Sequence, residues 1–111
     1  MKNIIIDFKK GKGLIPAIIQ DYKSGEVLML GFMNPEALKK TLESKWVYLW
    51  SRSRSKLWMK GEQSGNKLKV KKILMDCDAD TILIKAELAG TSVCHTGSKT
   101  CFKQSLRANR S

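Results

Sequence analysis

The first third of the chain alternates between apolar runs and short polar breaks. Ile15–Asp21 and Glu26–Phe32 are apolar and rich in β-branched or large side chains, which predicts two strands. The segment Tyr22–Gly25 between them contains serine and glycine, residues typical of turns. The pattern therefore predicts a β-hairpin over residues 15–32.

A helix start follows the hairpin. Asn34 is a good N-cap, and the proline after it suits the first helical position. We expect this helix to end near Ser44 and to turn Ala37, Leu38 and Leu42 toward the core.

The rest of the chain is mainly strand and loop. Three segments have the alternation or the β-branched content of strands: Trp46–Ser51, Lys67–Met75 and Thr81–Leu88. The polar, basic and glycine-containing stretch Ser51–Asn66 is interpreted mostly as a long loop, and Gly90–Phe102 as a turn-rich segment. One helix among about six strands predicts a mainly β domain with a minor helical part.

Length and composition fit one domain. The 111 residues, 42% of them hydrophobic, predict a single domain over 1–111, with its core in 13–102 and a frayed basic tail over 103–111. The longest apolar run, Val27–Met33, is far shorter than a membrane helix. The start of the chain has too few apolar residues for a signal peptide, so we expect a cytoplasmic protein without a membrane partner.

The charge is strongly unbalanced. Lys and Arg number 21 against 10 Asp and Glu, a formal net charge of +11. A positive field of this size favours nucleic acid, acidic lipid or phosphorylated metabolites as partners, without choosing among them.

Three aspartates are spaced two residues apart in the motif DCDAD. Asp76, Asp78 and Asp80 would point the same way in an extended chain, and their oxygen atoms suit Mg²⁺ or Ca²⁺. An acidic turn between two strands would equally explain them. An EF-hand is excluded because Thr81 stands where that loop needs glycine.

The cysteines suggest a second metal site. Cys94 and Cys101 flank the only histidine, His95, and Cys77 lies within the aspartate motif. In a reducing compartment the three thiols are better interpreted as metal ligands than as a disulfide. Three thiolates would leave one zinc position open, as catalytic zinc sites do. Three small buried side chains remain the alternative.

A third motif, Trp50–Gly61, interleaves cations with tryptophans. Such a stretch suits a ligand that has both phosphate and a flat base. A solvated basic loop whose tryptophans pack into the core would give the same sequence.

Taken together, these segments resemble the phosphoribosyl-AMP cyclohydrolase family of histidine biosynthesis. The resemblance covers residues 13–102 and is carried by six blocks in order: Pro16–Asp21, Gly25–Asn34, Ser51–Arg54, Leu57–Asn66, Asp76–Asp80 and Cys94–Phe102. The sequence departs little from the family pattern, with Thr100 where serine is common.

The resemblance implies a fold, two metals and a dimer. The implied fold is a bent, mixed β-sheet, similar to a barrel, with one main short helix, in an intertwined homodimer. The zinc ligands would be Cys77, Cys94 and Cys101, with Cys77 donated by the partner subunit. The Mg²⁺ ligands would be Asp76, Asp78 and Asp80.

The resemblance also implies a reaction. Zinc-activated water would hydrolyse the N1–C6 bond of the adenine ring of phosphoribosyl-AMP, and His95 would act as general base or proton shuttle. We expect Arg52, Arg54 and Lys60 to bind the two phosphates of this phosphorylated nucleotide, and Trp58 to stack on the base or brace the loop.

Two other functions compete with this enzyme. A basic RNA-binding module with a structural zinc would explain the charge and the Ser-Arg repeats, but not the cysteines together with the aspartates. A small structural-zinc interaction domain would unfold on chelation without catalysing anything. The enzyme is the preferred interpretation, and no nucleic-acid partner is expected.

Overall fold

The computed structural model describes residues 5–107. An open four-stranded sheet forms its centre, with strands in the order β2-β1-β6-β5. The strands are β1 (Ile15–Asp21), β2 (Val27–Met33), β5 (Lys67–Met75) and β6 (Ile82–Ala89). β1 pairs antiparallel with β2 and parallel with β6, and β5 pairs antiparallel with β6. The fold is therefore mainly β with a mixed sheet, as predicted.

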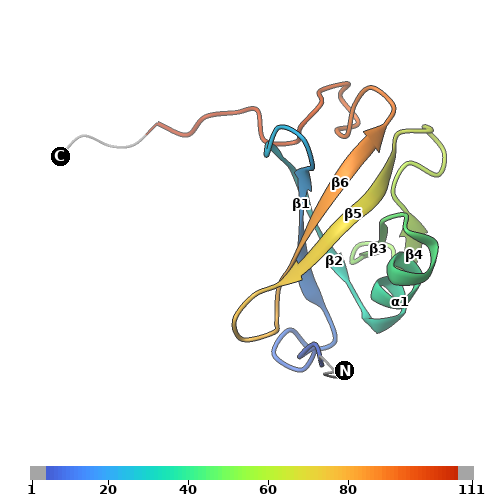
Figure 1. Cartoon of the computed structure of the whole chain (residues 1–111), viewed down its shortest axis with the longest axis vertical. Coiled ribbons are helices and arrows are strands. Elements are labelled where there is room, and N and C mark those ends of the chain that lie inside the picture. Colours follow the sequence, from blue (N-terminus) through green and yellow to red (C-terminus); the bar gives the residue numbers. More distant parts are fainter. Residues whose placement is uncertain (1–4, 108–111) are drawn as a thin grey trace.

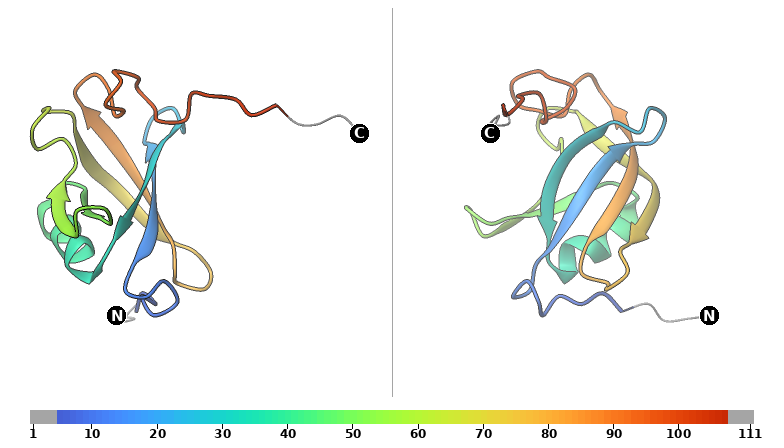
Figure 2. Two further views of the ribbon diagram at one scale, coloured as in Figure 1. Left: turned by 180° about the vertical axis from the view of Figure 1, so that it is seen from behind. Right: turned by 90° about the vertical axis from the view of Figure 1, so that its left-hand side faces the viewer.

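One face of the sheet is covered by the remaining elements. These are the helix α1 (Pro35–Ser44) and the two-stranded sheet of β3 (Tyr48–Ser51) and β4 (Lys56–Met59). Figures 1 and 2 show the helix and the small sheet together on one side, with the strongly twisted large sheet on the other. β2 and β5 are edge strands, so the mixed sheet is not closed into a barrel.

The core lies between the sheet and this cover. Alternating residues of β1 and β6 supply its centre, and they are fully or almost fully buried: Ile15, Ala17, Ile19, Ile82, Ile84 and Ala86. This period of two is what a strand requires to bury one face. Leu28 and Met33 of β2 and Leu49 of β3 complete the same apolar cluster.

The helix begins where the sequence predicts. The Asn34 side chain accepts a hydrogen bond from the backbone N–H of Ala37 at 2.8 Å, and proline follows it. Ala37 is buried and Leu38 half-buried, but Leu42 is 53% exposed, so its predicted core position is wrong. Thr41 is buried instead, because its hydroxyl accepts a hydrogen bond from the Tyr48 N–H at 2.9 Å and so ties the helix to β3.

The segment interpreted as a long loop holds a strand. β4 occupies Lys56–Met59 within Ser51–Asn66, so the loop prediction is wrong there. The strand forms because Trp58 and Leu57 pack against the core and the backbone pairs with β3 from Tyr48 to Ser51. Charged residues at both ends of these four residues made the alternation of apolar and polar side chains hard to recognise in the sequence. The other predicted strands are confirmed within two residues of their ends.

The ends of the chain add little to the core. Residues 103–107 have no regular secondary structure and lead away from the sheet (Figure 1), while residues 108–111 of the predicted basic tail lie outside the described residues. Within residues 5–107, none of the helices has the length and apolar character needed to cross a membrane.

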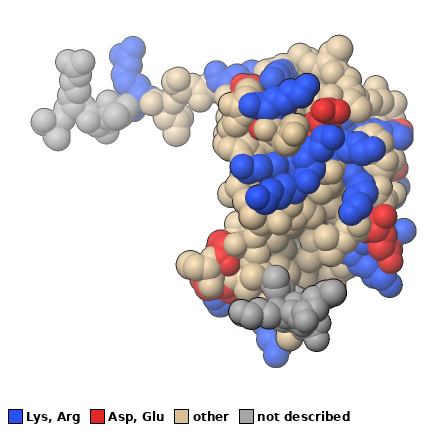
Figure 3. Space-filling view, viewed as in Figure 1, with Lys and Arg blue, Asp and Glu red and all other residues tan. Residues whose placement is uncertain are grey.

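Basic side chains gather on the outside of the sheet. Figure 3 shows lysines and arginines in a band on the face that β5 presents to the viewer. Lys67 and Lys69 each place their ammonium 5.5 Å from the ring centroid of Trp46, and Lys71 lies 5.6 Å from that of Tyr22. These contacts hold the aliphatic stems of the lysines along the aromatic rings.

The hairpin turn between β1 and β2 is held by a carboxylate. Asp21 accepts hydrogen bonds from the Ser24 N–H at 2.9 Å and its hydroxyl at 2.6 Å, and Lys99 lies 3.8 Å away. These contacts lower the pKa of Asp21, the Ser24 hydrogen bonds most. The charged form is thus favoured in the folded state, and its stabilisation is present above the unfolded pKa of 3.8.

We therefore expect Asp21→Asn to lower the melting temperature by roughly 2–5 °C at pH 7. This deficit should shrink as the pH falls below 3.8 and through the lower pKa of the folded state, because wild-type Asp21 is then protonated too. Thermal unfolding at several pH values measures it. Glu43→Gln, on the exposed face of α1, is the control and should change little. A deficit independent of pH would contradict the assignment.

Candidate functional site

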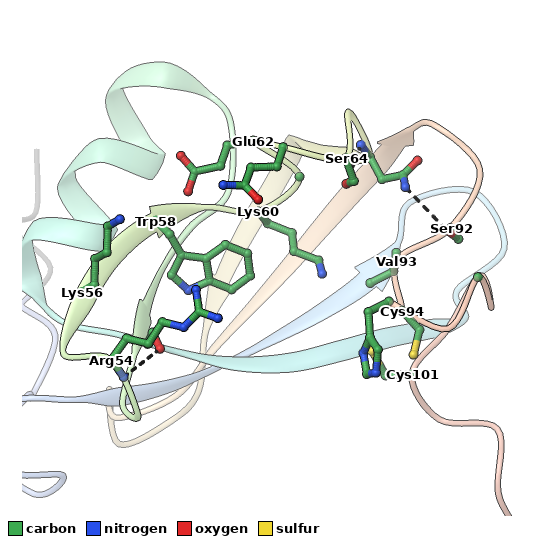
Figure 4. A pocket seen from close by; sticks show the side chains of 16 residues that line it. Arg54, Lys56, Trp58, Lys60, Glu62, Ser64, Ser92, Val93, Cys94 and Cys101 are labelled. Carbon is green, nitrogen blue, oxygen red and sulfur yellow. Dashed lines mark hydrogen bonds between the residues drawn. The ribbon is translucent and has the colours of Figure 1, made fainter.

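A pocket of about 640 Å³ lies between β4, the loop that follows it and the turn-rich segment after β6. Its lining includes the following residues: Arg54, Lys56, Trp58, Lys60, Glu62, Ser64, Asn66, Ser92, Cys94, His95 and Cys101. Figure 4 shows Arg54, Lys56 and the indole of Trp58 at one end, the two cysteines at the other, and Lys60 extending between them. The pocket thus joins two motifs that are about forty residues apart in the sequence.

The cysteine end is built on an irregular loop that is fastened to β2. The backbone N–H of Cys101 donates to the carbonyl of Leu28 at 2.8 Å. The hydroxyl of Thr100 donates to the carbonyl of Val27 at 2.7 Å and accepts from the N–H of Phe102 at 3.0 Å. These bonds fix the backbone on both sides of Cys101.

Asn66 fastens the same loop from the other side. Its side-chain oxygen accepts from the Thr91 N–H at 3.0 Å, and its amide nitrogen donates to the Ser92 hydroxyl at 3.5 Å. Gly61 and Gly90 leave room for this residue, because a Cβ on either would lie within 2.3 Å of an Asn66 oxygen. Both glycines also have positive φ, which other residues adopt at a cost.

Both thiols line the pocket, and their surroundings act on their pKa values in opposite directions. The Thr96 hydroxyl, 3.1 Å from the Cys94 sulfur, lowers the pKa of Cys94. The Lys103 ammonium in turn donates to Thr96. Burial and the neighbouring Cys94 raise the pKa of Cys101, and the Lys60 ammonium opposes that rise. Two sulfur donors at one end of a pocket suit zinc.

The structure places Cys77 far from this pair. Cys77 lies in the turn between β5 and β6, whereas Cys94 follows the other end of β6. Eight strand residues separate them, about 26 Å along the sheet. Among the described residues, the three aspartates form the only cluster of three potential ligands within 4.8 Å, so no third such group completes the cysteine site. Within one chain the three cysteines are therefore not brought together.

The aspartate cluster lies in the turn that carries Cys77. Asp76 accepts from the N–H groups of Asp80 and Thr81 at 3.0 and 3.2 Å, which turns the chain back on itself. The ligand oxygens of Asp76, Asp78 and Asp80 lie within 4.8 Å of one another, and a cluster of hard oxygen donors fits Mg²⁺.

Charge inside the cluster is divided unevenly. The Lys10 ammonium lies 3.3 Å from Asp78 and 3.5 Å from Asp80, and no local pattern in the sequence indicates this interaction. The hydrogen bond with Lys10 lowers the pKa of Asp78, whereas the neighbouring Asp76 raises that of Asp80. The cluster is thus partly neutralised by the N-terminal segment.

The structure does not bring the three predicted phosphate ligands together at one place. Arg54 lines the pocket, but the Arg52 guanidinium lies 3.9 Å from the Phe32 ring centroid and Arg52 is not among the lining residues. Lys60 points from the indole of Trp58 toward the cysteines (Figure 4). Lys56, which the sequence interpretation missed, lies on the Arg54 side of that indole. The alternation of side chains along β4, which places Lys56 on the same face as Trp58, is the feature of the sequence that could have identified it.

The pocket thus combines cations, an aromatic face and a thiol pair, as a site for an anionic ligand with a planar ring requires. Comparison with known proteins identifies the family. The family model "Phosphoribosyl-AMP cyclohydrolase" matches residues 29–103. The chain therefore belongs to the phosphoribosyl-AMP cyclohydrolase family, which is the family its motifs predict.

Relatives of that name cover nearly the whole chain. A Clostridium botulinum (strain 657 / Type Ba4) protein is 59% identical over 101 residues, 91% of each chain. One from Solibacter usitatus is 53% identical over 103 residues, 93% of this chain and 82% of its own. One from Pelobacter propionicus is 57% identical over 99 residues, 89% of this chain and 79% of its own.

The fastening of the cysteine loop gives a prediction. Thr100→Val keeps the shape of the side chain but removes the hydroxyl that binds the Val27 carbonyl. We expect zinc affinity to fall about five- to thirtyfold, because the hydroxyl also accepts from the Phe102 N–H and each lost hydrogen bond contributes about 1 kcal/mol. Competition with a chromogenic chelator measures it. Thr100→Ser retains the hydroxyl and should retain the affinity. Equal zinc affinity in Thr100→Val and wild type would show that this bond does not position Cys101.

Proposed function

We propose that this chain hydrolyses phosphoribosyl-AMP at the N1–C6 bond of its adenine ring, with zinc at the cysteine end of the pocket. The observation that carries the proposal is that one pocket, in a member of this family, joins the thiols of Cys94 and Cys101 to Arg54 and Lys56. The product is the ring-opened formimino-aminoimidazole carboxamide ribonucleotide of histidine biosynthesis.

The two ends of the pocket suit two parts of this substrate, one of its phosphates and its base. Arg54 and Lys56 bind phosphate, since guanidinium and ammonium groups form charge-assisted hydrogen bonds to phosphate oxygens. Trp58 lies between them and the cysteines and offers a flat apolar surface to the base. Arg52 holds the β3–β4 turn by its contact with Phe32 and so keeps Arg54 in place.

The cysteine end supplies the chemistry. Cys94, Cys101 and a third thiolate would hold zinc, which when bound would supply a Lewis acid that makes water more acidic and more nucleophilic, though less so than at a three-histidine site. His95 lines the pocket beside Cys94 and accepts a proton from the attacking water or passes one to N1. The Mg²⁺ that Asp76, Asp78 and Asp80 would bind lies at the opposite end of β6 from the cysteine pair of the same chain.

A homodimer would complete the zinc site. Cys77 is too far from Cys94 within one chain, so the third thiolate has to come from a second copy. The uncovered face of the sheet supports such an assembly: one row across its four strands is apolar, with Leu30 44% and Leu74 39% exposed, and Ile18 and Leu83 between them. A two-fold axis through this face would pair it with the same face of a second copy and would give the dimer two equivalent Cys77 turns.

The activity itself is tested by adding phosphoribosyl-AMP and following the ultraviolet change as the purine ring opens. We expect turnover in the zinc-loaded protein, its loss on chelation and its return when zinc is added back. No turnover by folded, zinc-loaded protein would contradict the proposed reaction. Full-rate turnover in a sample that elemental analysis shows to be free of zinc would contradict the role of the metal alone.

Mixing subunits tests the shared site. Cys77→Ala and Cys94→Ala chains should each be inactive, because each lacks one thiolate at every zinc site. A mixed dimer should recover activity, up to about half of the wild-type rate per dimer, since one of its two sites is intact. The control mixes Cys94→Ala with Cys101→Ala, which leaves no intact site. Hybrid dimers isolated with two affinity tags that show no recovery would contradict the sharing of Cys77.

A further inference from the structure

Two of the pocket's three cations lie on one face of β4 and its continuation. Lys56, Trp58 and Lys60 alternate along β4 and its continuation, so their side chains point the same way. The N–H of Lys60 still donates to the carbonyl of Val47 at 3.0 Å, which extends the pairing of β4 with β3 by one residue. At about 3.3 Å per residue, the α-carbons of Lys56 and Lys60 lie about 13 Å apart. One phosphate group is too small to bridge them.

The Lys60 ammonium lies at the cysteine end of the pocket. It is 5.5 Å from the ring centroid of Trp58, and in Figure 4 it extends from the indole toward Val93 and Cys94. Arg54 and Lys56 lie on the other side of the indole. Trp58 therefore divides the pocket, with a pair of cations on one side and a single cation on the other.

Within the described part of the chain, the Lys60 ammonium forms no ion pair with a carboxylate. The ion pairs found among residues 5–107 involve Lys10 and Lys99. A donor of three hydrogen bonds thus faces the space beside the thiols, where the ring of the substrate would lie.

We propose that Lys60 is a catalytic residue, which donates a hydrogen bond to the oxygen that bonds to C6 during ring opening, and that Arg54 and Lys56 bind phosphate without it. The inference rests on the proposed function and assigns Lys60 to the reacting end of the same substrate.

The chemistry of ring opening explains what a hydrogen bond from the Lys60 ammonium would do. With the ribosylated ring in its cationic form, the water oxygen bonds to C6 and the N1–C6 bond breaks. The electron pair of that bond and one water proton remain on N1, and the second proton is released as C6–O becomes a carbonyl. Negative charge grows on this oxygen between the loss of its protons and the formation of the carbonyl. A fixed ammonium stabilises that charge more than it stabilises the bound substrate.

The experiment compares Lys60→Met with Lys56→Met, which removes the same charge from the same strand face. Steady-state kinetics with phosphoribosyl-AMP give kcat and KM, and calorimetry with AMP reports phosphate binding without reaction. We expect Lys60→Met to lower kcat about 100-fold and to leave the Kd for AMP within about twofold. We expect Lys56→Met to raise KM and the Kd for AMP about tenfold, the loss of one charge-assisted hydrogen bond.

Zinc content and melting temperature separate catalysis from structure. Lys60→Met should keep both, and Lys60→Arg, which retains the charge, should recover part of kcat. A Lys60→Met variant with unchanged kcat and weaker AMP binding would overturn the proposal, because Lys60 would then be a phosphate ligand. Loss of kcat together with zinc would overturn it too. Absence of turnover in the wild type would instead refute the proposed function.

Discussion

The pocket depends on how an irregular loop is attached to a regular sheet. Residues 90–102 have no helix or strand, yet they carry both thiols that face Trp58. Hydrogen bonds from Thr100 and Cys101 to the carbonyls of β2, and from the loop to Asn66, take the place of secondary structure. Because each contributes only about 1 kcal/mol, the geometry of the thiols depends on several of them acting together.

Much of the fold could be predicted because it follows local rules. The alternation in β1 and β6, the N-cap at Asn34 and the turn between β1 and β2 each depend on a few neighbouring residues. β4 was missed because its four residues are stabilised by pairing with β3 and by burial of Trp58, neither of which is local. The prediction for Leu42 was wrong because Thr41 accepts a hydrogen bond from the backbone N–H of Tyr48 in β3. Thr41 therefore lies on the buried side of the helix in its place.

The candidate site divides in the same way. Motif spacing selected the cysteines, the aspartates and the basic stretch around Trp58 as candidates, and the structure brings Cys94, Cys101 and part of the basic stretch to one pocket. Spacing could not show which cations share one end of the pocket. The β3–β4 turn directs Arg52 to Phe32, and the alternation along β4 places Lys60 nearer to the cysteines than Arg54. Nor could spacing reveal Lys10, because nothing local links residue 10 to residue 78.

The open sheet has two edges, and each is protected from adding a foreign strand. On β2, the carbonyls of Val27 and Leu28 are already occupied by Thr100 and Cys101, so the loop that carries the thiols also seals this edge. On β5, a line of lysines makes the approach of another strand unfavourable. Damage to the thiol loop would therefore have a second effect besides loss of the pocket: it would expose an apolar edge strand and favour aggregation.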